Sequence, residues 1–131
     1  MNANRMKFIH NTGGRERYYR GTKTGDCVIR AIAITTNTDY KKVWEDLNDI
    51  SRHKGYYSNQ TQVYETYLKQ LGWQEVKTGR PFPQVNQLQV DRAIVYCRAG
   101  YGTHLVAIVD GDLHDIWDCR DRVAYSYWEK A

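Results

Sequence analysis

Among the residues of this 131-residue chain, Cys27 is the strongest candidate for a reactive side chain. It follows Gly25 and Asp26 and precedes an apolar run, so it falls in the first turn of an expected helix. The unpaired N–H groups and the positive dipole at a helix start favour the thiolate, which is the nucleophilic form. The same N–H groups can hold the oxyanion of an acyl-transfer intermediate. Cys27 is therefore interpreted either as a nucleophile or as a small buried hydrophobic residue.

His104 is the candidate general base and acid. It follows the glycine-bearing stretch 100–103 and begins an apolar strand, which places an imidazole at the rim of a cleft. There it could take the thiol proton and later protonate a leaving group. The alternative is a surface histidine at a strand end.

An aspartate on the expected hairpin is the candidate group that orients the imidazole. A three-residue loop at 110–112 would place Asp118 opposite His104, with both side chains on one face. A two-residue loop would move Asp118 off that face and make Asp115 a diagonal neighbour of His104. We expect Asp118, because it lies at the strand end where His104 begins, and keep Asp115 as the alternative. Either carboxylate could instead cap the strand or bind a nearby arginine.

The other cysteines and histidines form no recognisable site. Three cysteines without a secretion signal argue against a disulfide framework, and no two of them have C-x-x-C spacing. Cys97 is expected in the core, and Cys119 has no expected activation. The remaining histidines lack a consistent ligand spacing, so we expect no metal and no cofactor.

Length and composition indicate one globular domain over residues 1–131. Hydrophobic residues make up 41% and charged residues 26% of the chain, which argues against disorder. No apolar stretch approaches the roughly 18 residues of a membrane span, and the N-terminus lacks an apolar signal segment, so we expect a cytoplasmic protein. The net charge is only +4, and the basic segment 15–23 is short, so nucleic acid is not the expected partner.

Helices precede strands along the chain, which predicts an α+β fold. Residues 27–34 could form a strand, but we favour a central buried helix because of the preceding N-cap candidates and two internal alanines. Apolar spacing predicts further helices over 39–52 and 61–71 and a short one over 84–89. An antiparallel sheet is expected from strands at 92–98, 104–109, 113–117 and 122–128, with Asp110-Gly111 as a hairpin signal.

Two blocks of the sequence resemble the papain-like cysteine peptidases. They run from Gly25 to Ile34 and from Thr103 to Asp118, about a fifth of the chain. The second block is similar to the corresponding region of small bacterial peptidases that trim leader peptides within transporters, and to short uncharacterised phage and bacterial proteins. The resemblance implies a papain-like fold, with the N-terminal helices packed on a C-terminal antiparallel sheet. It also implies Cys27 as nucleophile, His104 as base and acid, and Asp118 as orienting residue.

That family normally places a glutamine shortly before the cysteine as an oxyanion donor, and residues 20–26 contain none. The candidate oxyanion or substrate contacts that remain are Thr22, Thr24, Asp26, Tyr101 and Asn11. The first expectation is a hydrolase that cleaves a peptide, isopeptide or related amide bond of a peptide or protein substrate. The alternative is a weakly active or inactive binding module on the same scaffold, such as a phage-encoded inhibitor of a host protein.

Overall fold

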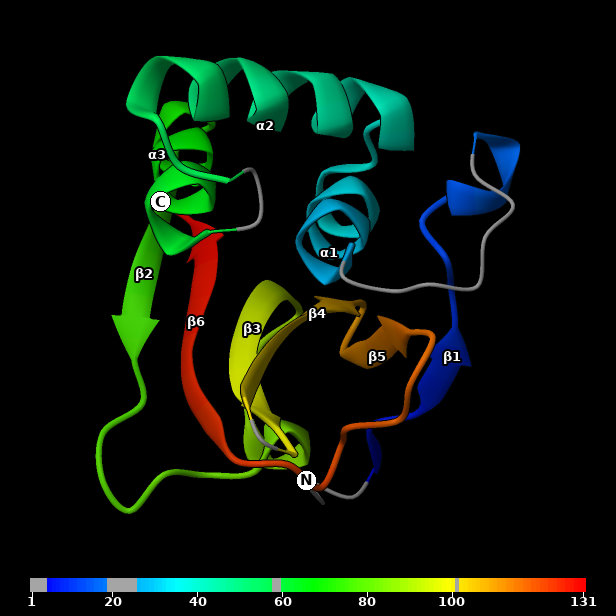
Figure 1. Ribbon diagram of the computed structural model, residues 1–131. Coiled ribbons are helices and arrows are strands. Elements are labelled where there is room, and N and C mark those ends of the chain that lie inside the picture. The colour runs from blue at the N-terminus through cyan, green and yellow to red at the C-terminus, as the bar shows by residue number, and fades with distance from the viewer. Residues whose placement is uncertain (1–4, 19–25, 58–59, 101) are drawn as a thin grey trace.

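The computed structural model describes residues 5–18, 26–57, 60–100 and 102–131. Within these residues, three helices pack on a six-stranded sheet (Figure 1), which confirms the α+β class. The helices are α1 (Cys27–Thr36), α2 (Tyr40–Lys54) and α3 (Thr61–Gln70). The strands are β1 (Phe8–His10), β2 (Trp73–Lys77), β3 (Arg92–Ala99), β4 (Gly102–Val109), β5 (Asp112–Asp115) and β6 (Ala124–Lys130). Two short 3-10 helices cover Arg15–Arg17 and Val85–Gln87.

The sheet has the strand order β1-β5-β4-β3-β6-β2 and is mixed rather than purely antiparallel. β1 pairs with β5 in parallel, with Phe8 beside Leu113, while the other pairs are antiparallel. Strands β3 to β6 were expected from the sequence, whereas β1 and β2 were not among the expected strands. The chain therefore adds a strand at each edge of the expected sheet.

Residues 27–36 form a helix and not a strand. The chain leaves α1 at Asn37, whose left-handed backbone (φ 52°) lets its N–H reach the carbonyls of Ala33 and Ile34. Two alanines and the C-terminal cap at Asn37 favour the helix over the β-branched residues within it. α1 packs against β4, and α2 crosses over it on the same side of the sheet (Figure 1).

The sheet has a buried cluster on each face. On the helix side, residues of all three helices pack on β3, β4 and β6, among them Val28, Ile32, Leu47, Leu68, Ile94, Leu105 and Trp128. Alternate residues of the same strands form the second cluster with the Val85–Gln87 turn and the segments flanking β1 and β5. Because both faces of β3 and β4 are buried, the position of β4 relative to α1 is held from two sides. In the described part of the chain, no helix combines the length and apolarity that a membrane span requires.

Candidate active site

Cys27 is the first residue of α1, and its sulfur faces the start of β4. The thiol forms hydrogen bonds with the ring of His104 and with the backbone N–H of Leu105. Asp26, the N-cap residue, makes no side-chain hydrogen bond to the first turn, so the N–H groups beside the sulfur are not capped by it. Cys27 is half-buried, whereas Cys97 and Cys119 are fully buried. The helix start therefore presents one reachable thiol and N–H groups that can receive negative charge.

His104 is bound on its other side by Asp115. The ring Nε2 lies 2.7 Å from Oδ2 of Asp115, and Asp115 is only 2% exposed. Because Nε2 is engaged, Nδ1 is the ring nitrogen left for the thiol of Cys27. A cysteine from α1, a histidine from β4 and an aspartate from β5 thus form one hydrogen-bonded chain.

Asp115, and not Asp118, is the carboxylate that contacts His104. The turn between β4 and β5 has two residues, Asp110 and Gly111, and both have positive φ (55° and 79°). This geometry suits the twist of a tight hairpin and sets Val109 opposite Asp112, so Asp115 becomes the diagonal neighbour of His104. The expected contact between Asp118 and His104 required a three-residue turn, and it is absent because the turn has two residues.

Asp118 instead binds an arginine near the surface. Its two carboxylate oxygens lie 2.9 and 2.8 Å from Nε and Nη2 of Arg120. Hydrogen bonding by Arg120 lowers the pKa of Asp118, whose side chain is 43% exposed. The sequence analysis had considered such a pairing as an alternative for either aspartate.

The surroundings of Cys27 and His104 favour a thiolate beside an imidazolium. Burial raises the pKa of Cys27, but the hydrogen bonds from His104 and Leu105 and the charges of His104 and Arg30 bring it below its usual value. Burial lowers the pKa of His104, but its hydrogen bonds to Asp115 and Cys27 outweigh burial and raise the pKa to about 10. Cys27 therefore loses its proton at a lower pH than His104 does, the reverse of the usual order for a cysteine and a histidine. A cysteine nucleophile requires this thiolate–imidazolium state.

Arg30 is a residue of this site that the sequence analysis missed. It is 1% exposed, and its guanidinium contacts the carboxylates of Asp26 and Asp115. Asp26 also accepts a hydrogen bond of 2.7 Å from the hydroxyl of Tyr40 and lies 3.4 Å from Arg15. The carboxylate of Asp26, expected as an oxyanion or substrate contact, is thus used inside the protein. The sequence does contain a signal for Arg30, since it is a charged residue within an apolar run. Such an arginine is expected to be buried, and a buried arginine must be paired with an acidic group.

The ring of Trp117 borders His104. The ring of Trp117 lies edge-on to His104, 5.5 Å between centroids, and Arg122 lies 5.2 Å from the centroid of Trp117. Trp117 therefore covers the imidazole on one side. Trp117 was expected within a strand at 113–117, whereas β5 ends at Asp115, and its contact with His104 was not expected.

A pocket of about 500 Å³ opens between α3, β2, β3 and β6. The aromatic rings of Tyr64, Phe82, Tyr96 and Tyr125 line it. Tyr96 is the cross-strand partner of Leu105, the residue whose N–H contacts the reactive sulfur. One lining residue of the pocket is therefore the cross-strand partner of a residue next to the thiol.

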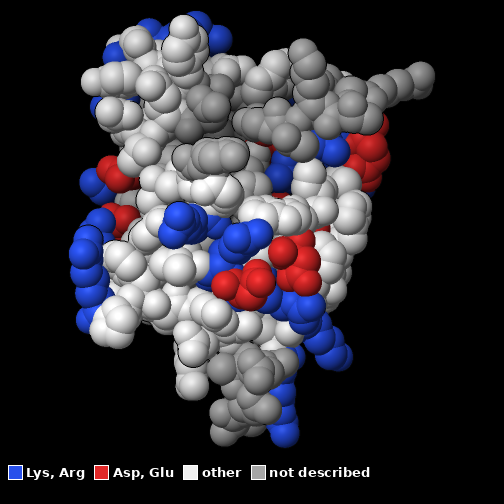
Figure 2. Space-filling model, turned by 60° about the horizontal axis from the view of Figure 1, so that its bottom comes forward, with Lys and Arg blue, Asp and Glu red and all other residues white. Residues whose placement is uncertain are grey.

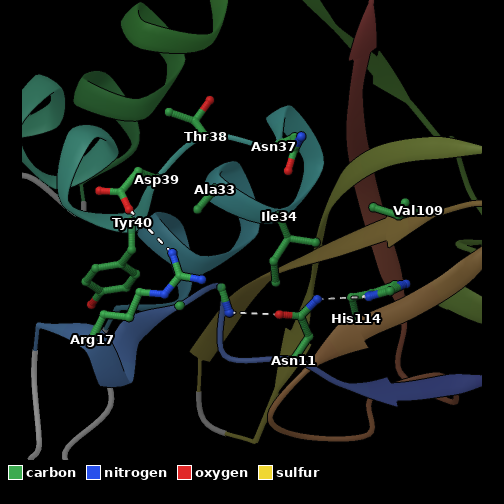
Figure 3. Close-up of a pocket in the computed structure, with 12 residues that line it drawn as sticks. Asn11, Arg17, Ala33, Ile34, Asn37, Thr38, Asp39, Tyr40, Val109 and His114 are labelled. Atoms are coloured by element: carbon green, nitrogen blue, oxygen red, sulfur yellow. Dashed lines mark hydrogen bonds and ion pairs between the residues drawn. The ribbon is translucent and has the colours of Figure 1, made fainter.

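The other expected oxyanion or substrate contacts do not add to this site. Thr22, Thr24 and Tyr101 lie outside the described residues. Asn11 hydrogen bonds His114 (3.1 Å) and the N–H of Gly13 (2.9 Å), as Figure 3 shows. It lines a second pocket of about 450 Å³ at the C-terminal end of α1, away from Cys27. The donors that the described residues offer for an oxyanion are therefore the N–H groups of the first turn of α1.

No family model, curated protein or solved structure matches this chain.

Proposed function

We propose that this chain is a papain-like cysteine hydrolase that cleaves a peptide, isopeptide or related amide bond. The observation that carries the proposal is the hydrogen-bonded chain from Cys27 through His104 to Asp115, built from three separate elements. The lowered pKa of Cys27 and the raised pKa of His104 support a thiolate–imidazolium pair.

The reaction proceeds through a thioester. The thiolate of Cys27 attacks the carbonyl carbon, and the N–H groups at the start of α1 bind the oxyanion that forms. As the tetrahedral intermediate collapses, the C–N bond breaks and the imidazolium of His104 gives its proton to the departing amine. Neutral His104 then takes a proton from water, whose oxygen attacks the thioester. Release of the carboxylic acid product restores the thiolate and the imidazolium.

A peptide or protein is the proposed substrate rather than nucleic acid. Acidic and basic side chains are interspersed on the face that Figure 2 shows. Two of the basic residues have acidic partners: Arg120 pairs with Asp118, and Arg122 lies 3.8 Å from Asp121. Nucleic-acid proteins gather basic residues on one face instead. The pocket beside β3 has aromatic rings and, at its lining, the charged side chains of Glu75 and Arg80, so it is suited to an aromatic side chain of a substrate that also carries polar groups.

The second candidate is a binding module with a slow or inactive centre. It is favoured by the absence of glutamine from residues 20–26 and by the engagement of Asn11 with His114, far from the thiol. Loss of one oxyanion donor typically costs about 100- to 1000-fold in rate. Under this reading the reactive thiol would persist without efficient turnover.

Alkylation of Cys27 by iodoacetamide across pH tests the proposal. The labelled cysteine is identified by mass spectrometry in the wild type, in His104→Ala and in the control His53→Ala, an exposed histidine of α2. We expect rapid labelling well below pH 8 in the wild type and the control, and its loss in His104→Ala. Wild-type labelling as slow as that of buried Cys119 would contradict the proposal.

A second measurement separates the hydrolase from the binding module. An activated peptide ester is added, and the intact mass of the protein is followed over time. A thioester adduct on Cys27 that forms and then disappears with release of acid supports the hydrolase. A reactive Cys27 that forms no adduct, or an adduct that persists, supports the binding module.

A further inference from the structure

The guanidinium of Arg30 is buried beneath the reactive pair. It belongs to α1, one helical turn after Cys27, and only 1% of the residue is exposed. Nitrogen Nε is buried with no hydrogen-bond partner among the described residues. A buried ion pair adds little stability compared with apolar packing, and here one donor is also left unpaired. Stability alone is therefore a weak reason for a charge at this position.

The carboxylate of Asp115 is held between two cations. Its Oδ1 lies 3.2 Å from Nη2 of Arg30, and its Oδ2 lies 2.7 Å from Nε2 of His104. With one partner on each oxygen, the carboxylate plane cannot rotate without breaking a contact. Arg30 thus limits where Asp115 can hold the imidazole.

The far side of Arg30 is anchored as well. Its Nη1 contacts Asp26, whose other oxygen accepts a hydrogen bond of 2.7 Å from Tyr40. Arg15 is a second cation that contacts Asp26. From the thiolate of Cys27 through His104, Asp115 and Arg30 to Asp26, the charges alternate in sign. Each buried charge in this row has an opposite charge beside it.

We propose that Arg30 is a positioning residue of the proposed hydrolase, holding Asp115 against His104 and favouring the thiolate of Cys27 through its permanent positive charge. The inference rests on the proposed function and adds a fourth side chain to it. The charge of Arg30 is one of the causes that lower the pKa of Cys27. The planar guanidinium can also contact two carboxylates at once, which fixes Asp115 relative to Asp26.

The test is the pH midpoint of Cys27 alkylation in Arg30→Met and Arg30→Lys. Loss of an opposite charge and of a fixed carboxylate should raise the midpoint by about one pH unit or more in Arg30→Met. Lysine keeps the charge but has no planar fork to span two carboxylates, so Arg30→Lys should shift the midpoint by about half as much. The control is Arg92→Met, which removes an arginine that donates to Thr35 O (2.6 Å) near the other end of α1 and should leave the midpoint unchanged.

Thermal denaturation identifies which variants are folded. A folded Arg30 variant with a lower melting temperature but the wild-type midpoint would overturn the inference, because a structural role moves stability alone. If Arg30→Met does not fold, Arg30→Lys is judged by the same criterion. A low wild-type midpoint that persists in both variants refutes the role of Arg30 and leaves the hydrolase intact. An ordinary thiol midpoint in the wild type refutes both.

Discussion

The substitution Asp115→Asn tests the arrangement of the site most directly. The hydrogen bond between Nε2 of His104 and Oδ2 of Asp115 is 2.7 Å long, and its carboxylate is buried. Hydrogen bonds to charged groups contribute about 1.5–3 kcal/mol, and one pKa unit corresponds to about 1.36 kcal/mol. Asp115→Asn should therefore lower the pKa of His104 by about one to two units. A less stable imidazolium stabilises the thiolate less, so the alkylation midpoint of Cys27 should rise.

The same substitution removes a partner of Arg30. Breaking a buried ion pair by removing one side costs about 3–5 kcal/mol, because the remaining charge is uncompensated. The melting temperature of Asp115→Asn should fall clearly below that of the wild type. The alkylation rate of Cys27 at pH 6 is compared at a temperature where the variant is folded, and it should drop by about tenfold or more.

Asp118→Asn is the matched control, because it changes the same side chain three residues later. Asp118 pairs with Arg120 near the surface, and exposed ion pairs contribute only about 0–1 kcal/mol. Its alkylation profile and melting temperature should match the wild type. If Asp118→Asn lost the reactivity of Cys27 while Asp115→Asn kept it, Asp118 would be the orienting group and the reasoning from the hairpin would be refuted.

Three further results are expected. A plot of hydrolysis rate against pH should be bell-shaped. The rate should rise as Cys27 deprotonates through its lowered pKa and fall as the imidazolium of His104 is lost near pH 10. A rate that stays constant on the alkaline side would contradict the role of His104 as acid. Trp117→Ala should slow alkylation at neutral pH about fivefold, since an aromatic contact contributes about 1 kcal/mol and water would reach the imidazole; an unchanged rate would show that the ring has no such role. Gly13→Ala should lower the free energy of unfolding by about 1–2 kcal/mol, because φ is +69° and the new Cβ would lie 3.3 Å from the backbone of α1. Gly14→Ala, with φ +89° and open space around it, should cost less in the same denaturant titration.

Local signals in the sequence were enough for the helices and the central hairpin. The apolar spacing of α2 and α3 and the alanines of α1 act within a few residues, so they can be recognised without the rest of the fold. The positions of Cys27 and His104 follow from the same kind of signal, because a helix start and a strand start are local features. The expected turn at Asp110-Gly111 was also correct in place.

The features that could not be predicted from the sequence depend on contacts between residues far apart in the chain. A single residue of turn length decides between Asp115 and Asp118, since alternate residues of a strand face opposite sides. Both turn lengths were compatible with the sequence. β1 has only three residues, and its pairing partner Leu113 is 105 positions after Phe8, so no local pattern reveals the pair. Arg30 was hidden for a similar reason, because its partner Asp115 is 85 positions away.

The pairing of β1 with β5 also bears on synthesis of the protein. Ribosomes deliver Phe8 early and Leu113 late, so this edge of the sheet closes only when most of the chain has been made. Until β4 has been made, Cys27 has no His104 beside it. Prematurely terminated products that stop before β4 would therefore hold an ordinary thiol, and the reactive form would arise only with the last strands.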